Sequence, residues 1–92
     1  MTVFSAEDAE RKLASLPGWG IVTGELVKTF SFKDFREALA FVNRVGEAAE
    51  AAGHHPDIDI RYNRVRLALV THDAGGLTEK DFELASKVNT LV

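Results

Sequence analysis

The sequence EAAGHHPDIDIRYNRVRLALVTH, residues 50–72, decides the fold of this 92-residue chain. Between residues 58 and 69, large apolar side chains alternate with charged or small ones, which is the two-residue period of strands that bury one face. A two-residue turn at Asn63-Arg64 would connect two such strands and pair Tyr62 with Val65. This register places every large apolar side chain on one face, and it predicts Tyr62 in the core.

The same hairpin brings the histidines together, because all three histidines of the chain lie within this stretch. Counted outward from the turn, His55 is predicted to lie opposite His72. Gly53 predicts the end of a helix, since glycine readily adopts the left-handed conformation, and Pro56 fixes the path of the chain beyond it. His54 and His55 then follow a helix C-terminus, whose carbonyl dipoles favour the imidazolium form.

The helix that ends at Gly53 is predicted to begin at about residue 33 or 34. Its buried face is indicated by apolar residues at three- and four-residue spacing, namely Phe35, Ala38, Leu39, Val42, Val45, Ala49 and Ala52. Phe41 and Ala48 lie off this stripe, and they either broaden the core contact or form part of a subunit interface, which is the interpretation that we favour. Glu50 occupies the last turn, four residues before His54, where it can accept an imidazole N–H.

The N-terminal part predicts a helix followed by a hairpin. Ser5 can cap the helix, and Pro17 stops it. The hairpin covers residues 19–32 with a turn at Gly24-Glu25, and Trp19 is expected in the core.

The last helix is predicted to begin after Thr78, with Asp81 completing a capping box. The order of elements is therefore helix, strand, strand, helix, strand, strand, helix. Short hairpins and apolar helix stripes predict an α+β fold in one domain over residues 1–92: a four-stranded antiparallel sheet with the helices packed on one face.

Composition narrows the function. Fourteen acidic and eleven basic residues give a formal charge of −3, without the clustered basic face of a nucleic-acid-binding protein. No apolar segment reaches the length of a membrane span, and the chain has no cysteine for a disulfide or a thiolate nucleophile. The N-terminus lacks a secretory pattern, which favours a cytoplasmic protein.

The spacing Glu50-x3-His54-His55-Pro56-x5-Tyr62-x9-His72-x8-Asp81 resembles the signature of the pterin-4a-carbinolamine dehydratase family. The segment from Thr71 to Thr78 is also similar, and the likeness extends from about residue 5 to the C-terminus. The sequence departs from the family at Gly53, where many members place an acidic or amide residue.

The resemblance implies a lyase that eliminates water from 4a-hydroxytetrahydropterin to give quinonoid dihydropterin, during the recycling of tetrahydrobiopterin for aromatic amino acid hydroxylases. Such a reaction needs an acid and a base that titrate near neutral pH, which histidines supply. The implied catalytic residues are His54, His55 and His72. We expect His54 and His72 to transfer the protons, in either assignment of acid and base, while His55 orients the pterin. The implied supporting residues are Glu50, Pro56 and Asp81, and no metal or other cofactor is implied.

Three other functions remain open. Three imidazoles could ligate a zinc ion. The chain could instead act only by binding, since some family members are dimerisation cofactors of a homeodomain transcription factor. The histidines could also be purely structural. The family forms dimers and tetramers, and a free strand edge and the long helix offer two surfaces for a homodimer or homotetramer.

Overall fold

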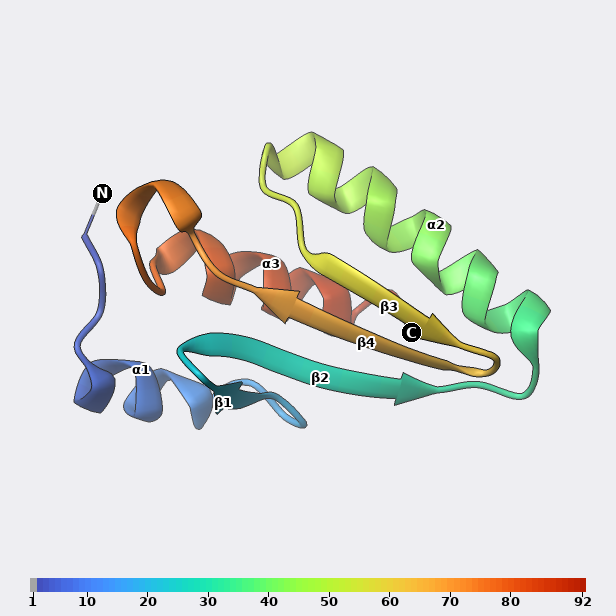
Figure 1. Ribbon diagram of the computed structural model, residues 1–92, viewed down its shortest axis with the longest axis horizontal. Coiled ribbons are helices and arrows are strands. Elements are labelled where there is room, and N and C mark those ends of the chain that lie inside the picture. The colour runs from blue at the N-terminus through green and yellow to red at the C-terminus, as the bar shows by residue number, and fades with distance from the viewer. Residues whose placement is uncertain (1) are drawn as a thin grey trace.

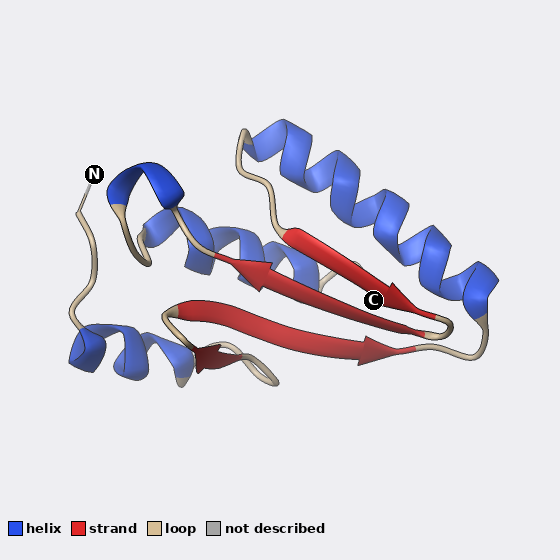
Figure 2. Cartoon of the chain, viewed as in Figure 1, coloured by secondary structure: helices blue, strands red, loops and turns tan. Residues whose placement is uncertain are grey.

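The computed structural model describes residues 2–92 and confirms the predicted order of elements (Figures 1 and 2). The helices are α1 (Ala6–Leu13), α2 (Phe35–Ala52) and α3 (Glu79–Asn89), with a short 3-10 turn η1 (His72–Ala74). The strands are β1 (Gly20–Val22), β2 (Glu25–Ser31), β3 (Asp57–Arg61) and β4 (Arg64–Leu69). The predicted caps are present, because the Ser5 side chain accepts from the Asp8 N–H and Thr78 and Asp81 form a capping box.

The strands form one antiparallel sheet in the order β1-β2-β4-β3, so β1 and β3 are its edges. One face carries the buried apolar residues of β2 and β4, namely Leu26, Phe30, Val65, Leu67 and Leu69. On the other face, Thr29 and Arg66 are exposed, Val27 is half-buried and the small Ala68 is buried. The helices therefore cover a single face of the sheet, as predicted.

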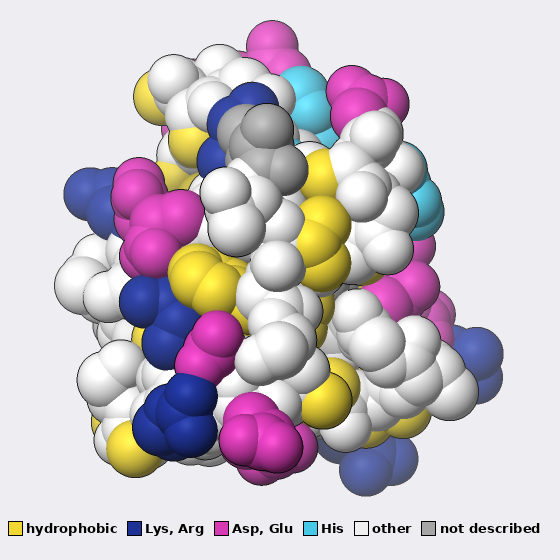
Figure 3. All heavy atoms as spheres, turned by 90° about the vertical axis from the view of Figure 1, so that its left-hand side faces the viewer, with side chains coloured by type: hydrophobic (Ala, Val, Ile, Leu, Met, Phe, Trp, Pro, Cys, Tyr) yellow, Lys and Arg dark blue, Asp and Glu magenta, His cyan; other side chains and the backbone are white. Residues whose placement is uncertain are grey.

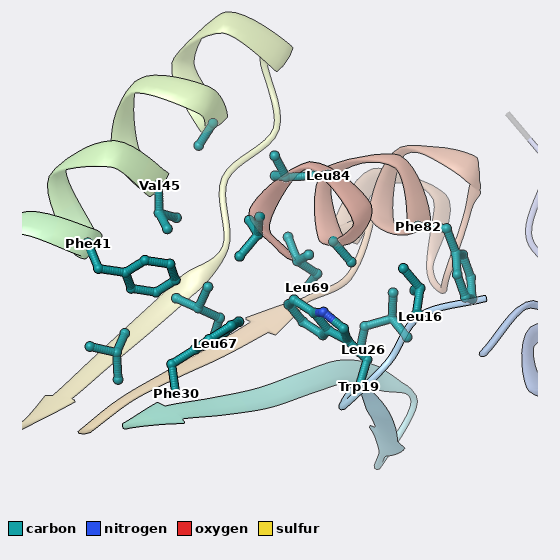
Figure 4. Close-up of a cluster of buried hydrophobic side chains, with 14 of the residues drawn as sticks. Leu16, Trp19, Leu26, Phe30, Phe41, Val45, Leu67, Leu69, Phe82 and Leu84 are labelled. Atoms are coloured by element: carbon teal, nitrogen blue, oxygen red, sulfur yellow. The ribbon is translucent and has the colours of Figure 1, made fainter. Parts of the chain in front are cut away.

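The core lies between that face and the helices (Figure 4). The Phe41 ring from α2 lies 4.7 Å from the Phe30 ring of β2, centroid to centroid. Trp19 meets Phe30 edge-on at 6.2 Å, and its indole N–H donates to Asn89 of α3 at 2.9 Å. The expectation that Trp19 belongs to the core is confirmed.

The buried face of α2 differs from the prediction. Its buried residues are Ala38, Phe41, Val45 and Ala49, whereas Phe35 is 47% exposed and Leu39 is 41% exposed. Of the two interpretations of Phe41, the core contact is correct and the favoured subunit interface is wrong, because its ring packs on Phe30 and Phe32. Both sets of residues have helical spacing, so apolar periodicity alone could not choose between two neighbouring stripes.

The second hairpin turns one residue earlier than predicted. Tyr62 and Asn63 form the turn, so Ile60 rather than Tyr62 pairs with Val65. Two hydrogen bonds hold Asn63 in this position. Its side-chain amide donates to the Phe32 carbonyl at 2.9 Å, and the Phe32 N–H donates to the Asn63 backbone carbonyl at 2.8 Å. Tyr62 is consequently not in the core: it has φ of 52° and is 67% exposed at the hairpin tip.

The first hairpin is shifted in the same way. It turns at Thr23-Gly24 rather than Gly24-Glu25, and both turn residues have positive φ. Each shift moves the pairing by two residues. The side chains that remain in the strands keep their predicted faces, because the side-chain period of a strand is two. The three helices of residues 2–92 are too short or too polar to cross a bilayer.

Candidate active site

The site begins where α2 ends, at Gly53. Its φ of 64° is left-handed, and its N–H reaches the carbonyls of the last turn. The following N–H, of His54, donates to the Ala49 carbonyl at 3.1 Å. The predicted helix end is confirmed, and this tight turn sends the two histidine side chains in different directions.

The His54 side chain extends inward to Asp81, the N3 residue of α3. Its Nε2 lies 2.5 Å from Asp81 Oδ1, and the two side chains are 11% and 0% exposed. The other carboxylate oxygen accepts from the Thr71 hydroxyl at 2.8 Å and from the Thr78 N–H at 2.9 Å. An ionised carboxylate can only accept a hydrogen bond, so the proton in this contact belongs to Nε2 of His54. The other ring nitrogen, Nδ1, is then the one that can contact a ligand.

The His55 side chain extends outward to Glu50. Its Nε2 lies 2.5 Å from Glu50 Oε2, and these side chains are 60% and 76% exposed. Glu50 therefore contacts an imidazole, as predicted, but it is the imidazole of His55. The predicted partner was His54, which Gly53 turns toward α3 instead.

The third histidine comes from the short turn after β4. The observed strand register, carried outward, sets His55 opposite Val70, so the predicted pairing of His55 with His72 is wrong by two residues. His72 instead begins η1, where a bridge between Thr71 and Gly76 folds the chain back.

The three histidines nevertheless share one hollow of about 260 Å³. Its lining consists of Gly53, His54, His55, Val70, Thr71, His72, Asp73 and Lys80. Figure 3 views this end of the molecule and shows imidazole side chains at the surface beside acidic ones. Pro56 does not line the hollow and leads from His55 into β3, while Tyr62 lies at the far end of that hairpin.

Sequence reasoning missed Thr71, Thr78 and Lys80 as residues of the site. Thr71 and Thr78 are buried, and their hydroxyls lie 2.8 Å apart beside Asp81. The signal available for Thr78 was the capping box itself, which places its side chain beside Asp81. Among residues 2–92, no three His, Asp or Glu side chains are placed to hold a metal ion together.

Comparison with known proteins identifies the class. Residues 2–91 match the family described as Pterin 4 alpha carbinolamine dehydratase. Two relatives carry the name "Putative pterin-4-alpha-carbinolamine dehydratase": one from Acidobacterium capsulatum is 58% identical over all of both chains, and one from Chloroflexus aurantiacus is 61% identical over 95% of this chain and 92% of its own. The chain belongs to the pterin-4a-carbinolamine dehydratase family.

Solved structures agree on the fold. The transcriptional coactivator/pterin dehydratase of Brucella melitensis superposes with a TM-score of 0.93, at 34% identity over 98% of each chain. A pterin dehydratase-like protein described as a RuBisCO assembly factor of the alpha-carboxysome superposes with a TM-score of 0.65. It is 24% identical over 79% of this chain and 84% of its own, so it shares the fold alone.

Proposed function

We propose that the chain is a lyase that eliminates water from 4a-hydroxytetrahydropterin and releases quinonoid dihydropterin. The observation that carries this proposal is the shared hollow, in which His54 is anchored by the buried Asp81 and His72 stands free at the mouth. Membership of the family supports the choice of substrate.

The chemistry requires two proton transfers. The bond between ring carbon 4a and its hydroxyl breaks as the hydroxyl takes a proton and leaves as water. A ring N–H gives up its proton, and its electron pair forms the new double bond to carbon 4a. No electrons leave the substrate, so one acid and one base within hydrogen-bond reach suffice.

We assign the acid to His54 and the base to His72. Asp81 occupies Nε2 of His54, so Nδ1 is the nitrogen that can carry a proton to the leaving hydroxyl. The exposed His72 can return the abstracted proton to solvent. His55, held by Glu50 at the rim, is placed to orient the ring.

The test is direct: quinonoid dihydropterin is followed spectroscopically from freshly generated 4a-carbinolamine, with and without the protein. Acceleration over the uncatalysed reaction supports the proposal. A rate equal to that of buffer, from protein that unfolds cooperatively, contradicts it. A positive result with pterin made by an aromatic amino acid hydroxylase would place the reaction in cofactor recycling.

We also propose that the protein forms a homo-oligomer through α2 and β3. Exposed large apolar residues gather on these elements and their hairpin tip, namely Phe35, Leu39, Ile58 and Tyr62. β3 is an edge strand, so it has unpaired backbone groups on its outer side. If the β3 strands of two copies paired antiparallel about Asp59, each Asp57 would lie opposite Arg61 of the partner subunit. Opposite charges would then face each other at both ends of the paired strands.

Light scattering of the wild type and of Ile58→Arg tests this surface. We expect an oligomer for the wild type and a monomer for the variant, because an inserted charge opposes burial of the strand. A wild-type monomer contradicts the proposal. A monomer without dehydratase activity that forms a stoichiometric complex with a transcription factor would favour the binding role that the Brucella relative's description includes.

A further inference from the structure

A second hollow adjoins the histidines. It lies between α2 and α3, has a volume of about 460 Å³, and shares His54 and Lys80 with the histidine hollow. The two hollows are therefore neighbours, with His54 and Lys80 in the lining of both. We call the hollow between α2 and α3 the groove; its lining runs from His54 and Lys80 to Lys87.

The floor of the groove consists of apolar side chains, most of them small. Ala48, Ala51 and Ala52 contribute it from α2, and Leu84 contributes it from α3. The alanines of α2 have only a methyl group each, so the space that longer side chains would fill is available to a ligand. An aliphatic chain can lie on this floor without burying a polar group of the protein.

The rim of the groove is charged. Lys80, Glu83 and Lys87 line it from one side of α3, at spacings of three and four residues. In the described chain, residues 2–92, neither lysine makes an ion pair with an acidic side chain. Two cations face one carboxylate, so the rim carries a net positive charge within a protein of formal charge −3.

We propose that the groove binds the side chain on ring carbon 6 of the pterin, and that the protein prefers pterins whose side chain ends in an anion such as a phosphate ester. This inference rests on the proposed function, because it places the ring in the histidine hollow. Lys80 at the junction and Lys87 further along would hold the anion between them.

The dimensions are compatible. Lys80 and Lys87 are seven residues apart, which is roughly 10 Å along the helix axis. A three-carbon side chain with a terminal phosphate extends roughly 6 Å or more from the ring at about 1.5 Å per bond. That reach is shorter than the axial separation of Lys80 and Lys87, and a Lys side chain can bind phosphate as a point charge.

The test uses two stable 7,8-dihydropterins, one with a trihydroxypropyl side chain and the other its terminal phosphate monoester, titrated calorimetrically. We expect the ester to bind about tenfold more tightly to the wild type, since a charged hydrogen bond contributes on that scale. Lys87→Gln should reduce this preference for the ester to about threefold. Glu83→Gln should increase the preference, because it removes a negative charge that repels the phosphate. High salt should weaken the preference of the wild type.

Lys33→Gln is the matched control, because Lys33 is exposed and lines neither hollow. It should leave the preference unchanged. The inference would be overturned if the wild type bound the two ligands with equal affinity. It would also be overturned if the ratio of the two affinities were the same in the wild type and in all variants. A change of oligomeric state in Lys87→Gln without a change in ligand preference would overturn it as well, since a partner subunit would then cover the groove.

Dehydration of the unphosphorylated 4a-carbinolamine separates this inference from the proposed function. Turnover without an anion preference contradicts the groove alone. An anion preference without turnover supports the groove and contradicts the proposed reaction.

Discussion

His54 and His55 are adjacent in the chain and make the same contact, an imidazole Nε2 at 2.5 Å from a carboxylate oxygen. Their surroundings are opposite. The pair of His54 and Asp81 is buried, whereas the pair of His55 and Glu50 is exposed to solvent. An exposed ion pair competes with water and salt and contributes little, while a buried carboxylate leaves its donors without a partner when it is removed. Equal distances therefore do not imply equal contributions.

The largest effects are expected in the proton-transfer pair. His54→Ala and His72→Ala should each lower the dehydration rate by about 10²–10⁴-fold, the usual contribution of a general acid or base. His55→Ala should cost only about tenfold if this residue orients the ring, since its exposed contact allows water to take its place. Initial rates with 4a-carbinolamine measure all three. Near-wild-type rates in the first two variants would remove the assignment.

The second prediction concerns stability at the buried pair. Asp81→Ala should lower the free energy of unfolding by about 3 kcal/mol, because the Thr71 hydroxyl, the Thr78 N–H and His54 all lose their acceptor. Urea denaturation followed by circular dichroism measures this loss. A loss below about 1 kcal/mol would indicate that water replaces the carboxylate.

The matched change at the exposed pair should be small. Glu50→Gln should alter the free energy of unfolding by less than about 0.5 kcal/mol, and this difference should vanish in high salt. The same urea experiment at two salt concentrations provides the measurement. An effect as large as that of Asp81→Ala would break the comparison, because it would mean that burial does not distinguish the two pairs.

A third charge, on Lys28, sharpens the comparison, because its hydrogen-bond acceptors in the described residues 2–92 are neutral. Its ammonium donates to the Pro17 carbonyl and to Asn89, each at 2.9 Å, and lies over the Phe30 ring. Desolvation by burial lowers the pKa of Lys28 from its usual 10.5.

The pKa of Lys28 is lower in the folded than in the unfolded chain, so the unfolded chain binds more protons just below pH 10.5. The free energy of unfolding should therefore rise with pH in that window. The wild type should therefore gain stability relative to Lys28→Met as pH approaches 10.5. Thermal unfolding of both proteins across the alkaline range measures this small difference. A constant difference would show that the pKa is the same in both states.

The sequence was sufficient for the order of the elements and for the faces of the strands. Alternation in β3 and β4 and the caps at Ser5, Gly53 and Thr78 are local signals, and a two-residue shift of pairing does not disturb them. The turn positions and the buried side of α2 were not accessible in this way. They depend on non-local contacts, such as that of Asn63 with Phe32 and the packing of Phe41 on Phe30.

The candidate site was predictable in its histidines but not in their partners. The chain topology brings residues 54, 55 and 72 to one end of the sheet, whatever the exact register. The choice of carboxylate depends on where each imidazole points after Gly53, and this is a property of the folded backbone. The capping-box interpretation of Asp81 was correct but incomplete, since its second oxygen caps α3 and its first contacts His54.

Under the proposed mechanism, that double use of Asp81 makes proton transfer depend on the first turn of α3. When this turn frays, the carboxylate leaves its position, and His54 loses the contact that fixes its tautomer. Local opening of a few residues, far short of unfolding the sheet, is then enough to stop the proposed reaction. On heating, activity should fail before the strands exchange their amide hydrogens, and a more rigid start to α3 would extend the working temperature without any change in the core.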